Sequence, residues 1–480
     1  GVSVAAGLAL AWVPLALVTS VLRLAVFAGL PTSSPALGAQ YLDYLLRFPM
    51  GRSELAALVL TALVATVLPL VRTLTGVGGA ALLAVAAVVP LAATGHASAG
   101  DFPESAVVTL AVHLVAAAVW VGGLLGVLLL QPQLGDVRAV VAARFSGLAL
   151  VCWTAVAATG LINLALALHD VSDLASVWGA ALITKVVLLL VLGVFGGWHR
   201  RRTLPQLAVL PSAFRRWAGA EAIVMAATLG VAVGVTVSAP PPEAAEDRQL
   251  LDVPWWLLGF PAPPPLTAAS WFTAGRLDLL WAGVAVSLAL AYLLGVRRLR
   301  RAAYAWAGRR TLTWLAGCVV LLYATSGAPG LYARVDYTAS VTQVVLLALV
   351  AAPLLVAGRP WQLVELTVSP RTDGSRGLRE WAAVAARPSS VQRLASLPAA
   401  LALLVVLLVG MSLSPVAEAT VRTWPAHTAT VAVALGAGLL LFAALRASSG
   451  ASGDQASARQ RAGVMAVLAG VLAMLGASAA

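Results

Sequence analysis

The chain of 480 residues is 61% hydrophobic and 10% charged, and its formal net charge is +12. A soluble protein carries about 25% charged residues, so this composition excludes an ordinary soluble domain and favours a membrane protein. The positive charge does not indicate nucleic-acid binding, because the arginines gather in short segments between apolar runs, as cytoplasmic loops do. We therefore expect a lipid bilayer, and no nucleic acid, around this chain.

Long apolar runs follow one another along the whole sequence. Each has roughly 18–25 residues, which is enough to cross ~30 Å of hydrocarbon as a helix, and none alternates as a barrel strand would. The sequence predicts an all-α fold, a polytopic integral membrane helix bundle with about 13 transmembrane helices. The predicted spans are 4–28, 54–72, 77–95, 105–130, 145–167, 178–197, 217–239, 278–296, 311–331, 337–357, 393–413, 426–446 and 461–478.

The longest connection between spans, 240–265, is rich in proline and contains two adjacent tryptophans. Prolines exclude one continuous helix there, so we expect a domain boundary. The predicted division has four parts, which are N-terminal membrane helices (1–94), a first membrane domain (95–242), an outer Pro- and Trp-rich linker (243–275) and a second membrane domain (276–480). The arginine-rich connection 198–216 is expected in the cytoplasm, and 96–104 outside.

Lys185 is the only lysine in the chain, and it lies in the apolar segment ALITKVVLLLVLGVFGG. An ionisable group inside a span is costly, so its presence is a hypothesis of function. At 1.5 Å per residue, His113, Asn163 and Lys185 fall ~12, ~6 and ~10 Å below the outer face, on three consecutive spans. This common depth predicts a polar site in the outer half of the membrane.

The outer loop before that layer, GHASAGDFPES, supplies His96, Asp101 and Glu104. These groups would attract a cation and pass it inward to His113. Imidazole suits copper, zinc and iron, so the ligand type alone does not choose the metal. We predict His96 and His113 as metal ligands, and Asp101 and Glu104 as part of the ion path.

Glu221 lies near the cytoplasmic end of the seventh span. Together with Lys185 and Asn163 it is predicted to serve an ion path or charge compensation. Simpler interpretations remain open, since a histidine such as His113 often packs by hydrogen bonding, a lysine can extend its stem outward, and an asparagine often joins helices. In the segment AVWVGGLLG, we expect close helix packing at Trp120, Gly122 and Gly123.

An ordered series of features lies over roughly 95–242, namely His113 with Trp-Val-Gly-Gly, Arg144-Phe145-Ser146, Gly160 with Asn163, Trp178-Gly179 with Lys185, and Glu221. As a set they resemble the copper resistance protein D (CopD) family of bacterial inner-membrane proteins. The resemblance implies copper handling, with a copper ion moving across or into the plasma membrane of a bacterium, and functional roles for Lys185 and Glu221.

The second half, roughly 278–478, resembles the cytochrome c oxidase assembly (CtaG) family, notably in RRTLTWLAGCVVLLYATSGAPGLYARVDYTASVTQVVLLALVAAPLLVAGRP. Members usually carry a His-Met-x-x-His-Met run, but here Ser340-Val341 and Val344-Val345 stand in its place, and His427 keeps one later histidine position. The resemblance therefore implies the fold of this half without its copper ligation.

Two functions follow as alternatives. The first is a copper-handling membrane protein that transports copper or supplies it to oxidase assembly, with a copper chaperone or respiratory oxidase subunits as partners. The second is a scaffold of a respiratory or envelope complex that binds no metal itself. We do not expect an enzyme, because no pairing of nucleophile and base is visible, and the phosphate-binding motif GxxxxGK[ST] is absent from the sequence.

Overall fold

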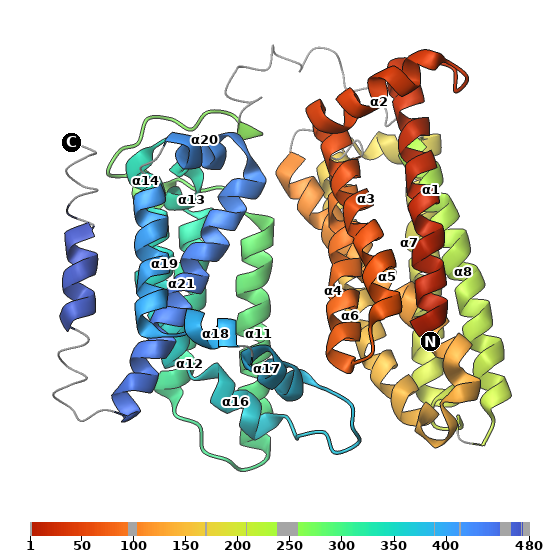
Figure 1. Ribbon diagram of the computed structural model, residues 1–480. Coiled ribbons are helices and arrows are strands. Elements are labelled where there is room, and N and C mark those ends of the chain that lie inside the picture. Colours follow the sequence, from red (N-terminus) through yellow and green to blue (C-terminus); the bar gives the residue numbers. More distant parts are fainter. Residues whose placement is uncertain are drawn as a thin grey trace. The chain divides into compact units, whose positions relative to one another are not determined.

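Helices make up the regular structure of the described chain, apart from an isolated bridge between Gly275 and Gly327. The computed structural model describes residues 2–94, 103–168, 170–207, 209–237, 258–387, 389–411, 414–451, 462–471 and 473. The chain divides into two compact units, Gly1–Leu250 (unit 1) and Leu251–Ala480 (unit 2). Each unit is a bundle of helices with its own core (Figure 1).

Ten helices among the described residues are long and apolar enough to cross a membrane, or eleven if the bent pair Leu397–Gly410 and Pro415–Arg422 is one span. The chain is therefore a multi-pass helical membrane protein. The ten are Val2–Ala28, Pro49–Leu70, Leu74–Ala93, Pro103–Gln133, Gly135–Ala167, Val177–Thr203, Pro211–Val235, Leu279–Arg301, Tyr337–Thr367 and Trp424–Ala447.

The predicted number of about 13 spans is not confirmed. The helices described within the other three predicted spans fall short in length or in apolar character. The helix Gly308–Ser326 begins with Arg309 and Arg310, which lower its mean hydropathy. The helix Leu397–Gly410 has 14 residues, and Ala462–Val471 is another short apolar helix.

The described part of unit 1 contains eight α-helices, several of which begin at local sequence signals. Ser34, Thr73 and Ser176 each accept a backbone N–H at a helix start, as N-cap residues do. A π-helical turn, His199–Thr203, continues α7. The helices are α1 (Val2–Ala28), α2 (Pro35–Arg47), α3 (Pro49–Val67), α4 (Leu74–Val88), α5 (Pro103–Leu130), α6 (Arg138–Ala167), α7 (Val177–Trp198) and α8 (Pro211–Val237).

Unit 1 has a buried core and an apolar outer surface. A buried cluster that includes Trp120, Leu124, Cys152, Leu192 and Phe214 joins α5, α6, α7 and the start of α8. The outer faces of these helices stay apolar, as at Leu161 and Val194, which are 61% and 71% exposed. Such faces would promote aggregation in water, so they are the surfaces that lipid covers.

Unit 2 is built from more and shorter helices. A π-helical turn, Leu346–Ala351, joins α14 to α15. The helices are α10 (Ser270–Thr273), α11 (Leu279–Arg301), α12 (Gly308–Ser326), α13 (Ala328–Tyr332), α14 (Tyr337–Val345), α15 (Ala352–Ala357), α16 (Pro360–Thr367), α17 (Leu378–Ala386), α18 (Ser389–Leu394), α19 (Leu397–Gly410), α20 (Ser414–Arg422), α21 (Trp424–Ala451) and the short helix 462–471.

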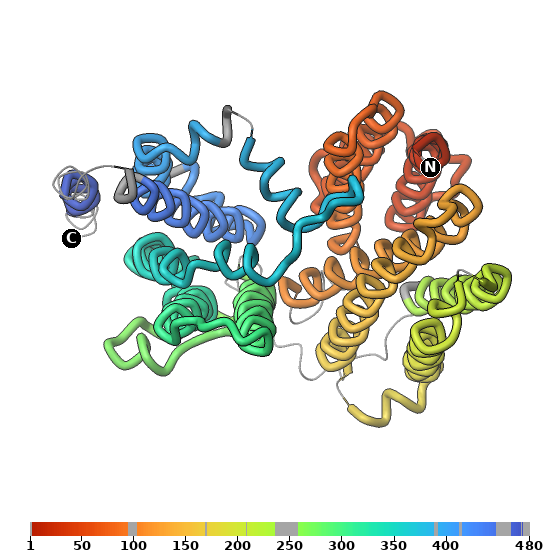
Figure 2. The backbone as a smooth tube through the Cα atoms, turned by 90° about the horizontal axis from the view of Figure 1, so that it is seen from below, coloured from red at the N-terminus to blue at the C-terminus, as the bar shows by residue number. Residues whose placement is uncertain are grey.

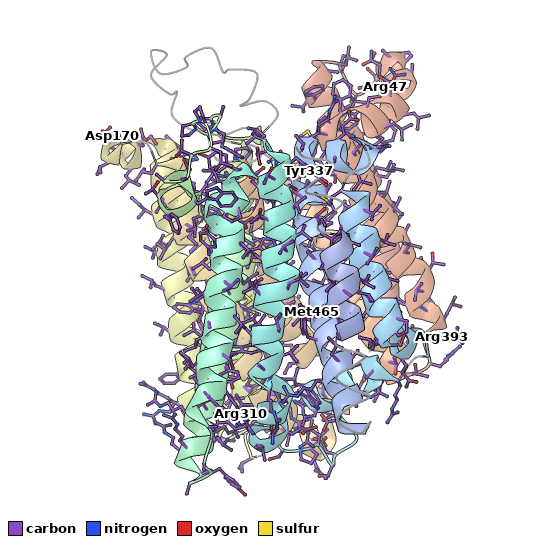
Figure 3. The ribbon with its side chains drawn as sticks, turned by 90° about the vertical axis from the view of Figure 1, so that its left-hand side faces the viewer. Arg47, Asp170, Arg310, Tyr337, Arg393 and Met465 are labelled. Carbon is purple, nitrogen blue, oxygen red and sulfur yellow. The ribbon has the colours of Figure 1, made fainter. Side chains whose placement is uncertain are left out.

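The long helices of unit 2 enclose a hydrocarbon core in which Leu321, Leu347, Leu404 and Leu441 are fully buried. Within this unit α11 and α12 lie side by side (Figure 2). Tyr337 lies at one end of the unit, and Arg310 and Arg393 lie at the other (Figure 3).

Part of the segment predicted as a linker packs against unit 2. The Tyr332 hydroxyl donates to the Pro264 carbonyl at 2.9 Å, and Arg334 Nη1 donates to the Leu258 carbonyl at 2.8 Å. Phe260 is buried under the Arg276 guanidinium, which lies 4.1 Å from the ring centroid. Residues 258–275 are therefore a folded edge of unit 2.

Candidate functional site

Two polar pairs link α5 and α6 one helical turn apart. Thr109 Oγ1 donates to Asn163 Oδ1 at 2.7 Å, and His113 Nδ1 lies 3.0 Å from Thr159 Oγ1. The helices run antiparallel in this pairing, because one turn forward on α5 matches one turn back on α6. Side chains from two different predicted spans therefore meet at two successive turns.

The hydrogen bonds of Thr159 decide which nitrogen of His113 carries the proton. The Thr159 hydroxyl donates to the Ala155 carbonyl at 2.6 Å, so its oxygen is left to accept from His113 Nδ1–H. The neutral ring then has its free lone pair on Nε2. A partner that fixes the tautomer in this way is typical of histidines that bind metals.

The ring of His113 lies over a glycine of α6. A Cβ placed on Gly160 would lie 3.7 Å from His113 Cε1, so the absence of a side chain leaves room for the imidazole. His113 and Asn163 are both half-buried in this helix pair. His113 on α5 therefore faces α6, and Asn163 on α6 faces α5.

Lys185 lies on α7, two turns after the helix begins, and is half-buried. Its ammonium is within electrostatic range of the His113 ring. Among the described residues, no hydrogen bond or ion pair involves the Lys185 side chain. The tight turn before α7 sets its depth, because Gly179 lies directly against the Asp173 carbonyl, where a Cβ would collide.

The predicted outer loop lies partly outside the described residues. His96 and Asp101 both fall in the gap between residues 94 and 103, so their proposed roles stay predictions. Glu104 lies in the first turn of α5, before Thr109 and His113 on the same helix.

The three residues predicted to pack helices closely differ in their surroundings. Trp120 is buried, 5% exposed, inside the cluster of α5–α8. A Cβ on Gly123 would lie 2.3 Å from Phe145 Cε2, so α5 and α6 approach closely there. A Cβ on Gly122 would meet no atom within 4 Å, so the close approach occurs at Gly123 and not at Gly122.

A second buried polar group lies at the other end of α7. His199 Nε2 is 3.2 Å from Glu221 Oε2, and both side chains are less than 10% exposed. The two atoms are close, but their geometry is not that of a hydrogen bond. His199 Nδ1 lies 2.6 Å from Thr203 Oγ1 across the π-helical turn, and such turns are frequent at functional sites.

His199 was missed by the sequence analysis, which placed it with the arginines of a cytoplasmic loop. It is 14 residues after Lys185, which is ~21 Å along the helix axis. Lys185 and Glu221 therefore do not form a direct pair, and each has a different histidine as its neighbour. The sequence did contain a signal: His199 precedes the run of arginines and follows the start of α7 at Val177 by about six turns, so it could be assigned to the span itself.

A third polar cluster joins the N-terminal helices and was also missed. Glu54 is buried and accepts from Ser20 at 2.5 Å and from Arg23 Nη1 at 3.2 Å. Arg23 Nη1 also donates to Thr94 Oγ1 at 2.7 Å. Burial, followed by the charge of Glu54, raises the pKa of the nearby Tyr44 hydroxyl. Glu54 was predicted at a span end, whereas α3 begins at Pro49 and encloses it.

The metal-binding capacity of these groups is small. Across the described part of the chain, no group of three or more His, Cys, Asp or Glu side chains could hold a metal ion. His113 supplies one imidazole nitrogen, and the inner pair supplies one carboxylate and one imidazole. Such sets suit brief contacts with a cation more than a closed site.

Two family models match the chain in series. The model for copper resistance protein D matches residues 139–235, and the model for cytochrome c oxidase caa3 assembly factor (Caa3_CtaG) matches residues 290–479. The resemblance to both families is confirmed. Asn163, Lys185, His199 and Glu221 lie inside the CopD match, and His113 lies before it. The matches indicate a copper-related membrane function.

Curated relatives are uncharacterised mycobacterial proteins. Those of Mycobacterium leprae (strain TN) and Mycobacterium bovis (strain ATCC BAA-935 / AF2122/97) are each 33% identical to this chain, over 125 and 126 residues. The matched part covers 26% of this chain and 19% of each relative, which is about a fifth of their length. No solved structure matches the chain.

Proposed function

We propose that unit 1 moves copper ions across the plasma membrane of a bacterium, with copper as cargo. The path has an outer station at His113 and an inner station at His199 and Glu221, joined along α7 by Lys185. The observation that carries the proposal is the hydrogen bond of His113 Nδ1 to Thr159, because it leaves Nε2 as a metal ligand inside a span.

Transport needs stations that bind a cation and then release it. A single imidazole at His113 and a single carboxylate with an imidazole at Glu221 and His199 have this character. Imidazole suits copper well, and a carboxylate less so. Both stations therefore offer one imidazole that suits copper, and the inner station adds a carboxylate.

Lys185 supplies charge compensation in this proposal. A protonated amine near His113 repels an arriving cation, so occupation of His113 is coupled to proton release from Lys185. The proton acceptors at the other end of α7 are His199, in the π-helical turn, and Glu221, on α8. Copper supply to an oxidase then follows if a chaperone or an oxidase subunit receives the ion at the far side. No step in this path is an enzymatic reaction.

The test measures copper accumulation in inverted membrane vesicles that contain wild type, His113→Ala, Thr159→Val or Thr154→Val. We expect His113→Ala to abolish uptake and Thr159→Val to reduce copper affinity about tenfold or more, since it removes the group that orients the ligand. Thr154→Val is the matched control, because Thr154 makes the same bond to the carbonyl four residues back but is exposed. Equal accumulation in all four preparations would remove His113 from the path.

A second function is favoured by one observation in unit 2. At the positions of the family's His-Met run, Ser340 and Val344 are buried, and Gln343 between them donates to the Ala324 carbonyl at 2.9 Å. This arrangement completes helix packing, which suits a scaffold for an assembly partner. Copurification of stoichiometric respiratory subunits without bound copper would support that alternative.

A further inference from the structure

A pocket opens at the arginine-rich end of unit 2, between α11 and α12. Its volume is about 440 Å³, and it is lined by Leu293, Val296, Arg297, Arg300, Arg301 and Thr311. Arg310, labelled in Figure 3, marks the same end of α12. The pocket lies within unit 2 and is separate from the polar groups of unit 1.

Five of the six lining residues form a stripe along α11, and Thr311 is on α12. Residues three or four positions apart share a helix face, which aligns Leu293 with Arg297, and Val296 with Arg300. The stripe is apolar toward the middle of the helix and cationic at its end. A ligand that fits this order has a hydrocarbon part and an anionic part.

The arginines are not needed to cap the helix. The chain turns back through Ala303, whose φ is 60°, and the N–H groups of Ala302, Ala303 and Tyr304 bond the carbonyls of Leu299 and Arg300. These bonds satisfy the last turn with backbone alone. The guanidinium groups of the stripe therefore remain available.

The pocket holds like charges without a counter-charge from the described chain. Arg297, Arg300 and Arg301 make no ion pair or hydrogen bond with another described residue, and like charges at these spacings repel one another. An anion with several oxygen acceptors would relieve this repulsion.

We propose that this pocket binds the phosphate headgroup of an anionic phospholipid. The guanidinium groups of Arg297 and Arg300 contact the phosphate oxygens, and an acyl chain follows Leu293 along α11. Basic pockets between membrane helices recognise anionic lipid headgroups in this way. The partly exposed Leu293 and Leu294, at 40% and 63%, continue the apolar surface toward lipid.

The experiment titrates the full chain in detergent with phosphatidylglycerol or phosphatidylcholine and counts bound lipid by native mass spectrometry. The test variant is Arg297→Gln with Arg300→Gln. The control variant, Arg298→Gln with Arg309→Gln, loses the same charge at the same end of the unit, but neither residue lines the pocket. All three proteins are compared as monodisperse samples, so that misfolding does not imitate a loss of binding.

We expect wild type to retain phosphatidylglycerol in preference to phosphatidylcholine, and the test variant to bind it roughly twentyfold more weakly. The control variant should stay within about twofold of wild type. Equal weakening in both variants would overturn the proposal, because it would show a general attraction of positive charge to anionic lipid. Full displacement of the lipid by an excess of inorganic phosphate would also overturn it, and would assign the pocket to free phosphate.

Discussion

The interiors of the two units differ in what they bury. Unit 1 brings polar side chains of different helices together, as in the hydrogen bond of Thr109 to Asn163 and in the close approach of His199 to Glu221. In the π-helical centre of unit 2, Leu347, Ala348 and Ala351 are buried hydrocarbon, and Gln343 bonds to backbone. The ionisable groups of unit 1 can exchange partners with a cargo, whereas the Gln343 amide completes helix packing.

Unit 2 also buries ionisable side chains. Arg334 is buried, and two of its nitrogens donate to the carbonyls of Val421 and Leu258. His427 is also buried, and its Nδ1 has no hydrogen-bond partner. Arg334 joins α20 to the segment before α10, which is a structural task.

The largest expected effect concerns the buried pair of unit 1. Glu221→Ala leaves His199 in a buried site without its carboxylate, and removing one partner of a buried pair costs about 3–5 kcal/mol. Glu418→Ala in unit 2 breaks an exposed pair with Arg422 on one helix, which is worth about 0.3–0.5 kcal/mol. Thermal unfolding of both variants in one detergent measures the difference. Similar midpoints would mean that the Glu221 pair contributes no more than a surface contact.

A close helix contact in unit 2 gives the next effect. A Cβ on Gly438 of α21 would lie 2.4 Å from the Ala348 carbonyl oxygen, whereas a Cβ on Gly436 would meet nothing within 4 Å. Overpacking costs about 1–3 kcal/mol, so Gly438→Ala should destabilise unit 2. Gly436→Ala should stabilise it by up to about 1 kcal/mol through helix propensity. Denaturant titration of the two variants should give shifts of opposite sign, and shifts of the same sign would refute the packing of α21 on the π-helical turn.

The sequence predicted the fold class and the two family resemblances, because apolar length and motif order are local properties of a chain. It placed His113, Asn163 and Lys185 at one depth, since helical rise converts residue number into distance. It did not predict Thr159 or Thr109, because a threonine in a span looks like any small residue until its neighbouring helix is known. His199 and Glu54 were missed for a related reason, since both lie within a few residues of predicted span ends.

The smallest expected effect tests whether the polar pairs of unit 1 are coupled across helices. In a double-mutant cycle of Thr109→Val and Asn163→Leu, loss of the 2.7 Å bond should give a coupling energy of about 0.6 kcal/mol, the average for interhelical hydrogen bonds in membranes. The matched cycle uses Thr109→Val with Thr154→Val, since Thr154 bonds its own helix and faces outward. That cycle should be additive, because residues without shared partners do not couple. Coupling of equal size in both cycles would show that it does not arise from the bond between Thr109 and Asn163.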